Sequence, residues 1–352
     1  MCDIEDIKKI YSRLQDDESK LIYIDRLNYS FTNDVSFLKN MVDKTTRDTA
    51  LWKNFLKQLV GLAAENELVI FGAGIWGNIL YNETCMLLHW KYMVDSNPIN
   101  KKVSNIQIFA FDKFIKEYKG EYVVISSYKN YQEMAVQLQE HGIPDERIID
   151  AGSVIYQLTE KAIYFDLKEL LPCRKQEVFV DAGCFDGTTT MQFFEWCDEQ
   201  GYSYCMEPDE QNIANIRKNL DDRQNFEIID KALWSKSTVL SMNAKGNFAT
   251  SIVELDNQDS LQKIETVALD DFLQEKTVTY IKMDIEGAEL EALRGAEKII
   301  TGQKPRLAIS IYHKLKDIWT IPQIILEYNP DYRLYLRHYS FADYDTVLYA
   351  IP

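Results

Sequence analysis

Apolar residues recur at every third or fourth position through the first part of the chain. In the segment IEDIKKIYSRL they include Ile4, Ile7 and Ile10, and residues 35–62 repeat the same spacing. This period places apolar side chains on one face of a helix. Glycine and proline are absent from nearly the whole stretch, so we expect a helical segment over residues 1–64. It carries no catalytic pattern and is typical of a packing or dimerising element, which makes a homodimer one candidate assembly.

From residue 65 the pattern changes to short apolar runs separated by helix-like segments. The runs LVIF, KYMVD, EYVVI and ERIID predict strands, and the same alternation resumes at VFVDA and continues through the rest of the chain. Strands that alternate with helices indicate parallel sheets. We therefore expect an α/β protein with two tandem Rossmann-like domains, over residues 65–155 and 156–352, behind the helical segment.

Composition narrows the classes of function. Asp and Glu number 55 against 39 Lys and Arg, which gives a formal charge of −16 and a pI near 4.8. A nucleic-acid partner is not expected, because phosphate binding needs a positive surface. No apolar run approaches the roughly 18 residues that cross a membrane, and the first residues lack the apolar core of a signal peptide. The six cysteines are scattered without a C-x-x-C pair, as in reduced proteins, so we expect a cytoplasmic protein.

Two glycine loops follow predicted strands, and the first matches a nucleotide-binding pattern. Gly72, Gly74 and Gly77 form G-x-G-x-x-G, and Asp95 ends the next strand, 18 residues after Gly77. Such glycines let the backbone approach a phosphate at a helix N-terminus, and the acid suits a ribose hydroxyl. The bulky Trp76 beside the phosphate position argues against this interpretation. A bound nucleotide and a scaffold that keeps the turn for packing are both open here.

The second loop has an acid where the first has a glycine. Asp181 ends the strand VFVD, Gly183 and Gly187 follow, and Glu207 lies 20 residues beyond Gly187. A carboxylate at the first position repels a pyrophosphate but suits the ammonium group of S-adenosylmethionine (SAM). Glu207 has the spacing of an acid that binds ribose hydroxyls. The pattern predicts a SAM site, and buried acids that merely cap the turn are the alternative. The other predicted members of the site are Phe185 and Asp186 in the loop, and Asp230 and Ala232 near the adenine.

Acidic residues crowd the end of a later predicted strand, YIKMD. Asp284, Glu286 and Glu289 fall within six residues, and their mutual repulsion raises a pKa or calls for a cation. We expect Asp284 as general base or metal ligand, oriented by Lys282 from the same face of the strand, and Glu286 as its partner in a divalent metal site. The alternative is that Glu286 and Glu289 favour the N-terminus of the next helix. His313, at the end of the strand RLAISIYH, is the second candidate base.

Several longer motifs occur together in this half of the chain, and together they resemble the FkbM family of SAM-dependent methyltransferases. They are FVDAGCFDGTTT, MEPD, KALWS, TVALDDFL, YIKMDIEGAELEALRGAEKII and the closing YRLYLRHYSFADYDTVLYA, within residues 176–352. The resemblance implies a class I methyltransferase sheet with an antiparallel strand near the C-terminus, and O-methylation of a sugar, glycan or natural product. By position it also implies methionine binding by Asp181, Gly183 and Gly187, ribose binding by Glu207, and an acceptor beside residues 284–289.

The sequence thus predicts a SAM-dependent O-methyltransferase with a small-molecule or glycan acceptor, with a divalent metal ion as a second candidate cofactor. Acceptor contacts are expected from residues 246–251 and from Tyr335 and Tyr339. The alternative is an NAD(P)- or nucleotide-sugar-linked enzyme that works through residues 72–77, with the C-terminal domain as scaffold. A protein with two degenerate Rossmann folds and no catalysis is the third hypothesis.

Overall fold

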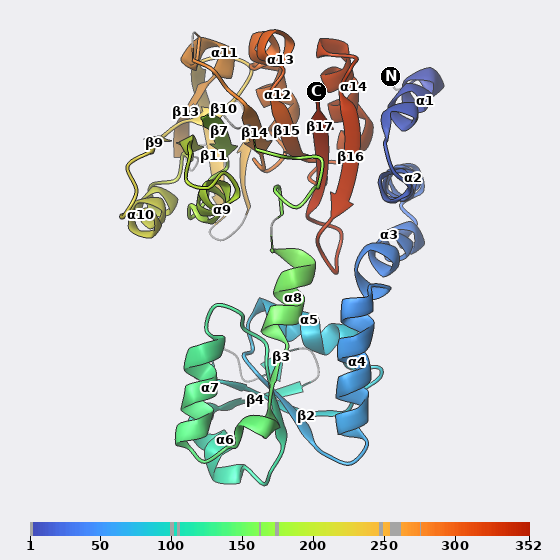
Figure 1. The fold of residues 1–352 in the computed structure, drawn as a ribbon, viewed down its shortest axis with the longest axis vertical. Helices are drawn as coiled ribbons and strands as arrows, with labels where there is room; N and C mark the ends of the chain where they lie inside the picture. The colour runs from blue at the N-terminus through green and yellow to red at the C-terminus, as the bar shows by residue number, and fades with distance from the viewer. Residues whose placement is uncertain are drawn as a thin grey trace. The chain divides into compact units, whose positions relative to one another are not determined.

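The computed structural model describes residues 3–98, 102–103, 106–161, 163–172, 176–245, 249–253, 262–274 and 276–352. Its contacts divide the chain into two compact units (Figure 1). Unit 1 comprises Met1–Met41, Ala162–His338 and Ala342–Pro352, and unit 2 comprises Val42–Lys161 with Tyr339–Phe341. None of the helices in the described ranges is long and apolar enough to cross a membrane.

The expected N-terminal helices form, but they are shared between the two units. They are α1 (Ile4–Arg13), α2 (Asp17–Thr32), α3 (Val35–Val42) and α4 (Ala50–Ala63). Asp3 and Asp16 cap α1 and α2 by accepting backbone N–H groups of the first turn. Helix α2 packs on strand β16 (Arg333–His338), where the Ser19 hydroxyl accepts the N–H of Leu336 at 2.9 Å. Helix α4 packs in unit 2. The contacts within the chain therefore do not separate residues 1–64 as a helical segment of its own. The spacing of apolar residues and the capping residues predict the helices, but they do not show against which sheet each helix packs.

Unit 2 is a doubly wound sheet with helices on both faces. Its strand order is β3-β4-β2-β1-β5-β6, parallel throughout except for β3. Helices α4, α5 (Ile75–Thr84) and α8 (Gly152–Thr159) contribute to the core on one face, and α6 (Phe111–Glu117) and α7 (Tyr131–Glu140) to the core on the other. The strands are β1 (Leu68–Phe71), β2 (Trp90–Asp95), β3 (Lys102–Val103), β4 (Ile106–Ala110), β5 (Tyr122–Ile125) and β6 (Ile148–Asp150).

Unit 1 is built on a seven-stranded sheet in the order β16-β17-β15-β14-β7-β8-β9. Strand β17 (Thr346–Ile351) runs antiparallel to both neighbours, and the pairs from β15 to β9 are parallel. The predicted α/β class and the antiparallel strand near the C-terminus are therefore confirmed. The parallel strands are β7 (Glu177–Ala182), β8 (Gly201–Met206), β9 (Phe226–Ile229), β14 (Tyr280–Met283) and β15 (Arg306–Ser310). The helices after them are α9 (Thr188–Trp196), α10 (Glu210–Asn219), α12 (Glu289–Arg294), α13 (Glu297–Gln303) and α14 (Asp317–Tyr328).

A second, four-stranded sheet belongs to unit 1 and was not among the predicted elements. Its order is β10-β13-β11-β12. Its strands are β10 (Ala232–Leu233), β11 (Thr238–Lys245), β12 (Ala249–Val253) and β13 (Gln262–Val267), and the short helix α11 (Leu269–Phe272) follows.

The segment before β7 also packs into unit 1. The ring of Phe165 lies 5.8 Å from that of Phe179, 5.7 Å from that of Tyr280 and 5.6 Å from that of Trp196. Residues 163–172 therefore belong with the C-terminal sheet, whereas α8, which contains the expected domain start at residue 156, lies in unit 2. The aromatic contacts that decide this boundary join residues far apart in the sequence, so local patterns do not show it.

Candidate active site

The loop after β7 lies directly against the end of β14. Gly183 has a φ of 75°, in the left-handed region, and a β-carbon there would collide with the carbonyl oxygen of Asp284. Only glycine meets both conditions without strain. Gly187 directly precedes α9 and completes the turn. Because β7 and β14 are parallel neighbours, with Met283 opposite Ala182, the glycine loop and the acidic segment share one edge of the sheet, where such sheets bind ligands.

Glu207 follows β8 and holds the glycine loop in place. Its Oε2 accepts the N–H of Phe185 at 3.0 Å, and its Oε1 accepts the N–H of Asp209 at 3.0 Å and the side-chain amide of Asn212 at 3.3 Å. Burial raises the pKa of Glu207, although these hydrogen bonds oppose the rise. A carboxylate oxygen accepts about two hydrogen bonds, so Oε2 can still receive one from a ribose hydroxyl. Phe185 leaves 43% of its surface exposed beside this carboxylate.

Asp181 is fully buried and is already paired within the chain. Its Oδ1 lies 3.1 Å from Lys282 Nζ, and its Oδ2 accepts the hydroxyl of Thr190 at 2.8 Å. Lys282 Nζ also donates to the carbonyls of Ala182 at 3.1 Å and Gly183 at 2.7 Å. Lys282 thus supplies a positive charge beside Asp181 and holds the carbonyls of the loop. Methionine binding by Asp181 and orientation of Asp284 by Lys282 stay predictions.

Asp284 is held by two tyrosines that the sequence did not single out. Tyr164 donates to its Oδ2 at 2.9 Å, and Tyr312 donates to its Oδ1 at 3.1 Å. Tyr312 follows β15 and precedes His313, so its place at a strand end was a signal that could have identified it. Tyr164 offered no such signal, because it lies 120 residues before its partner in the segment that precedes the sheet.

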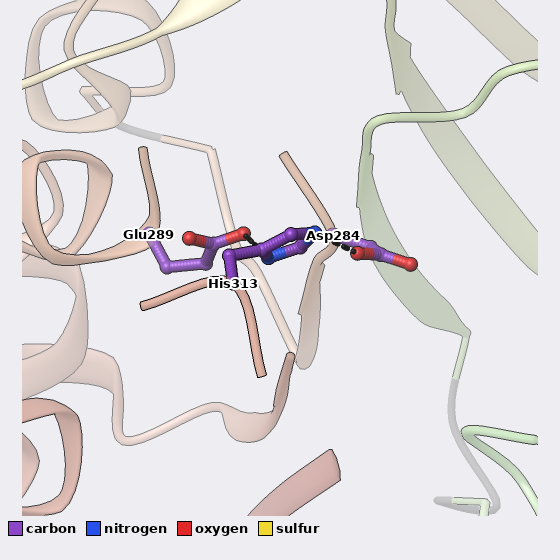
Figure 2. A group of neighbouring side chains, drawn as sticks. All are labelled: Asp284, Glu289 and His313. Atoms are coloured by element: carbon purple, nitrogen blue, oxygen red, sulfur yellow. Dashed lines mark ion pairs between the residues drawn. The ribbon is translucent and has the colours of Figure 1, made fainter. Parts of the chain in front are cut away.

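His313 lies among three carboxylates. Figure 2 shows its imidazole ring between the carboxylates of Glu289 and Asp284. Its Nδ1 is 3.0 Å from Glu289 Oε1, and its Nε2 is 3.6 Å from Asp284 Oδ1 and 3.6 Å from Glu286 Oε2. Burial alone would lower the pKa of His313. The contact with Glu289 and the charges of the other carboxylates outweigh burial and raise the pKa to about 9. The imidazole is therefore protonated at neutral pH in the site as described.

Two acids near this ring, Glu286 and Asp317, also have raised pKa values. Burial raises the pKa of Glu286, which takes a left-handed φ of 56°. Burial and the charge of Glu289 raise the pKa of the buried Asp317 to about 6, although the backbone N–H of Lys314 opposes the rise. Three carboxylates face one imidazole, so the edge carries an excess of negative charge. This charge disfavours phosphate and favours cations.

A divalent cation has one plausible set of ligands within the described ranges. Asp284, Glu289 and His313 offer donor atoms within 4.8 Å of one another, which differs from the predicted pair of Asp284 and Glu286. The two outer carboxylates contact different nitrogens of the ring, as Figure 2 shows. A protonated imidazole satisfies this arrangement, whereas a metal needs the ring to turn so that one nitrogen joins both carboxylates.

The other predicted SAM-site residues lie at or near the same edge. The side chain of Asp186 accepts the N–H of Thr188 at 3.0 Å, at the start of α9. Asp230 is exposed directly after β9, which neighbours β8. Ala232 is buried in β10. The structure thus brings Gly183, Phe185, Gly187, Glu207 and Asp230 to the strand ends from which Asp284 and His313 project.

In unit 2, the first glycine loop has the same local form. Gly72 has a φ of 109°, and a β-carbon there would lie 2.6 Å from Ser126 Oγ. Asp95 accepts the N–H of Ala73 at 3.0 Å and that of Asn97 at 2.9 Å. Gly74 is exposed at the start of α5, and Gly77 is buried within that helix. The acid predicted to bind ribose therefore stabilises the turn, and nucleotide binding by this loop stays a prediction.

The predicted acceptor contacts are only partly described. Residues 246–248 lie outside the described ranges. Tyr335 and Tyr339 are both buried, the first in the sheet of unit 1 and the second in unit 2. Contact of these tyrosines with an acceptor stays a prediction.

Comparison with known proteins gives a family match for most of unit 1. Residues 181–342 match the family model of the methyltransferase FkbM domain. The fold is similar to that of methyltransferase FkbM from Methylobacillus flagellatus KT, with 20% identity, a TM-score of 0.46, and coverage of 86% of this chain and 99% of that one. Fibrillarin from Aeropyrum pernix, solved with natively bound S-adenosyl-L-methionine, is 12% identical, with a TM-score of 0.36 and coverage of 54% and 72%. No curated protein matches. The family model thus shows a similarity of residues 181–342 to the methyltransferase FkbM domain.

Proposed function

We propose, from the match of residues 181–342 to the family model of the methyltransferase FkbM domain, that the chain transfers a methyl group from SAM to a hydroxyl of a sugar, glycan or natural-product acceptor. The observation that carries the proposal is the contact between the glycine loop and the acidic segment. Gly183 abuts the carbonyl of Asp284, so a ligand on the loop lies beside the Asp284–His313 cluster.

The charges at this edge support SAM over a dinucleotide. Asp186, Glu207, Asp284 and Glu286 all belong to the segments that follow its strands. Pyrophosphate would be repelled there, whereas a ligand that carries a sulfonium and an ammonium group would be attracted. Glu207 keeps an acceptor position for a ribose hydroxyl, and the exposed ring of Phe185 offers an apolar surface next to it.

We assign the role of general base to His313, ahead of Asp284. When bound, SAM would supply a methyl group on a sulfonium, whose sulfur would leave as the neutral thioether of S-adenosylhomocysteine when an oxygen nucleophile takes the methyl group. Glu289 anchors Nδ1 of His313 at 3.0 Å, which leaves Nε2 to take the hydroxyl proton once the imidazole is neutral. Both oxygens of Asp284 already accept a hydrogen bond from a phenol, so this carboxylate is held in one orientation. It is better suited to orient the acceptor hydroxyl.

The test separates the cofactor from the acceptor. Calorimetric titration with SAM, S-adenosylhomocysteine, NAD and a UDP-sugar should show binding of the first two by the full chain. Transfer of radiolabelled methyl from SAM to a panel of neutral sugars, glycans and polyhydroxy natural products then identifies the acceptor class. The proposal fails if neither SAM nor its demethylated product binds, and the O-methyl part fails if the label appears only on nitrogen or carbon.

Unit 2 is included in this titration through the UDP-sugar and NAD. The loop at residues 72–77 and the acid Asp95 keep the form of a nucleotide site, so nucleotide binding there is a separate proposal. Loss of UDP-sugar binding in Gly74→Val, with SAM binding unchanged, would support it. A Gly74→Val variant that still binds the nucleotide would refute this placement.

A further inference from the structure

We propose that Tyr164 and Tyr312 are positioning residues that fix the carboxylate of Asp284 for methyl transfer, an inference that rests on the proposed function. Their two phenols donate to different oxygens of the same carboxylate, at 2.9 Å and 3.1 Å. A carboxylate with a donor on each oxygen cannot rotate freely, so its remaining lone pairs keep a fixed direction.

Tyr164 is itself held by several contacts around its backbone and ring. Its N–H donates to the hydroxyl of Tyr349 at 3.0 Å, and its carbonyl accepts the hydroxyl of Tyr280. The ammonium of Lys282 lies 5.3 Å from the centre of its ring. Tyr164 also takes a φ of 78°, a region that a residue with a side chain occupies at a cost. Such strain, retained beside a reacting group, is a feature of functional sites.

Tyr164 lies outside the part of the chain that matches the family model. It precedes residues 181–342, which match the family domain, yet its hydroxyl donates a hydrogen bond to Asp284 at the end of β14. The segment between the two sheets therefore supplies part of the reaction site rather than serving only as a connection.

The second donor, Tyr312, competes with the histidine for one oxygen of Asp284. Tyr312 occupies Oδ1, which is the same oxygen that lies 3.6 Å from Nε2 of His313. Without that phenol, the carboxylate is free to turn toward the imidazolium and form a close ion pair. The tyrosines thus hold Asp284 toward the acceptor and leave Nε2 available for a proton.

The experiment compares Tyr164→Phe and Tyr312→Phe with a matched control, Tyr332→Phe. Tyr332 is fully buried and, like the other two tyrosines, donates a hydrogen bond, to the carbonyl of Pro305 at 2.6 Å, but it does not contact Asp284. We expect each of the first two variants to lower kcat about tenfold, with KM for SAM and acceptor within about twofold. The control should keep kcat. In an Asp284→Asn background, removing either phenol should cause no further loss, because the group that it positions is changed.

A second measurement does not need the acceptor. The titration of His313 is followed through its ring Cε1–H signal by NMR and assigned with His313→Gln. Asp284, Glu286, Glu289 and Asp317 are the charged groups around this ring. We expect Tyr312→Phe to move the midpoint upward by about half a pH unit or more, since Asp284 turns toward the ring. Tyr332→Phe should leave the midpoint in place.

The two measurements distinguish the proposals. If the wild type methylates an acceptor while both tyrosine variants keep kcat and the His313 midpoint, the positioning role is refuted and the proposed function stands. If no acceptor is methylated but the midpoint moves as expected, the proposed function fails and the control of Asp284 by the phenols is supported.

Discussion

The glycine loops of unit 1 and unit 2 have the same backbone geometry, but different side chains lie next to them. In each, a glycine with positive φ follows the first strand of the sheet in the sequence, and the acid at the end of the next strand accepts a loop N–H at 3.0 Å. The acids are Asp95 in unit 2 and Glu207 in unit 1. An acid about 20 residues after a glycine loop is therefore explained by the turn alone, before any ligand is considered.

The difference lies on the other side of each loop. In unit 2 the neighbouring strand β5 brings Ser126, whose hydroxyl donates to the carbonyl of Gly72 at 2.9 Å. In unit 1 the neighbouring strand β14 brings Asp284, and β15 beyond it leads to His313. The glycine loop therefore identifies the fold. Whether reactive side chains lie beside the loop depends on the residues at the ends of the neighbouring strands, which are β14 and β15 in unit 1.

The largest effect expected is on catalysis, in His313→Gln. Removing the base should lower turnover by about 10³, with SAM affinity unchanged, because the side chain does not belong to the loop. His141→Gln in unit 2, at an exposed histidine, is the control and should keep full activity. Single-turnover methyl transfer gives the measurement. Activity within threefold of wild type would move the role of base to Asp284.

The two loops can also be compared through their glycines. Gly183→Ala should lower the free energy of unfolding by about 3 kcal/mol, since positive φ and the collision with the Asp284 carbonyl add together. Gly74→Ala should cost less than about 1 kcal/mol, because φ is −75° and no atom lies within 4 Å of the new β-carbon. Denaturant unfolding of both variants is the measurement. Equal losses would show that Gly183 is not constrained by β14.

A matched pair of acids tests which loop binds SAM. Glu207→Gln should weaken SAM binding by about 1–3 kcal/mol, or roughly fivefold to 150-fold, since a charged acceptor is lost. Asp95→Asn removes the equivalent charge in unit 2 and should leave SAM affinity unchanged. Calorimetry on both variants gives the answer. A loss of SAM affinity in Asp95→Asn, with none in Glu207→Gln, would reverse the assignment of the two loops.

The pH dependence of methyl transfer should separate the two candidate bases. His313 must lose its proton to act, and its pKa is raised to about 9. Below that value the neutral fraction rises about tenfold per pH unit, so kcat should rise steeply from pH 7 to 8 and level off near 9. Initial rates at saturating substrate measure this. A profile that is flat across this range indicates Asp284 instead.

The smallest effect is expected from removal of divalent metal. The protonated imidazole of His313 already balances the charges of Asp284 and Glu289 in unit 1. Dialysis against a chelator should therefore change activity by less than about twofold. Measuring the activity before and after dialysis, and again after adding Mg²⁺ or Mn²⁺, tests this. A large loss that a metal restores would show that Asp284, Glu289 and His313 form a metal site.

The sequence by itself determined the periodic elements of this protein. Unbroken apolar runs predicted β1 and β7, and the antiparallel strand near the C-terminus followed from the family motifs. The strand-end positions of Glu207, Asp284 and His313 were also readable, because a parallel sheet gathers such positions at one edge. These features depend on neighbours within a few residues or on the rules of parallel sheets.

Only the tertiary structure decided which charges are already satisfied within the protein. Asp181 looked available to a ligand until Lys282 was seen beside it, and Asp284 looked free until Tyr164 and Tyr312 were placed on its two oxygens. The division of the chain was decided in the same way, by the aromatic packing of the segment before β7. Local patterns cannot show such contacts, because burial and pairing join side chains that lie far apart in the sequence, such as Tyr164 and Asp284 at a separation of 120 residues, and these contacts set how a carboxylate behaves.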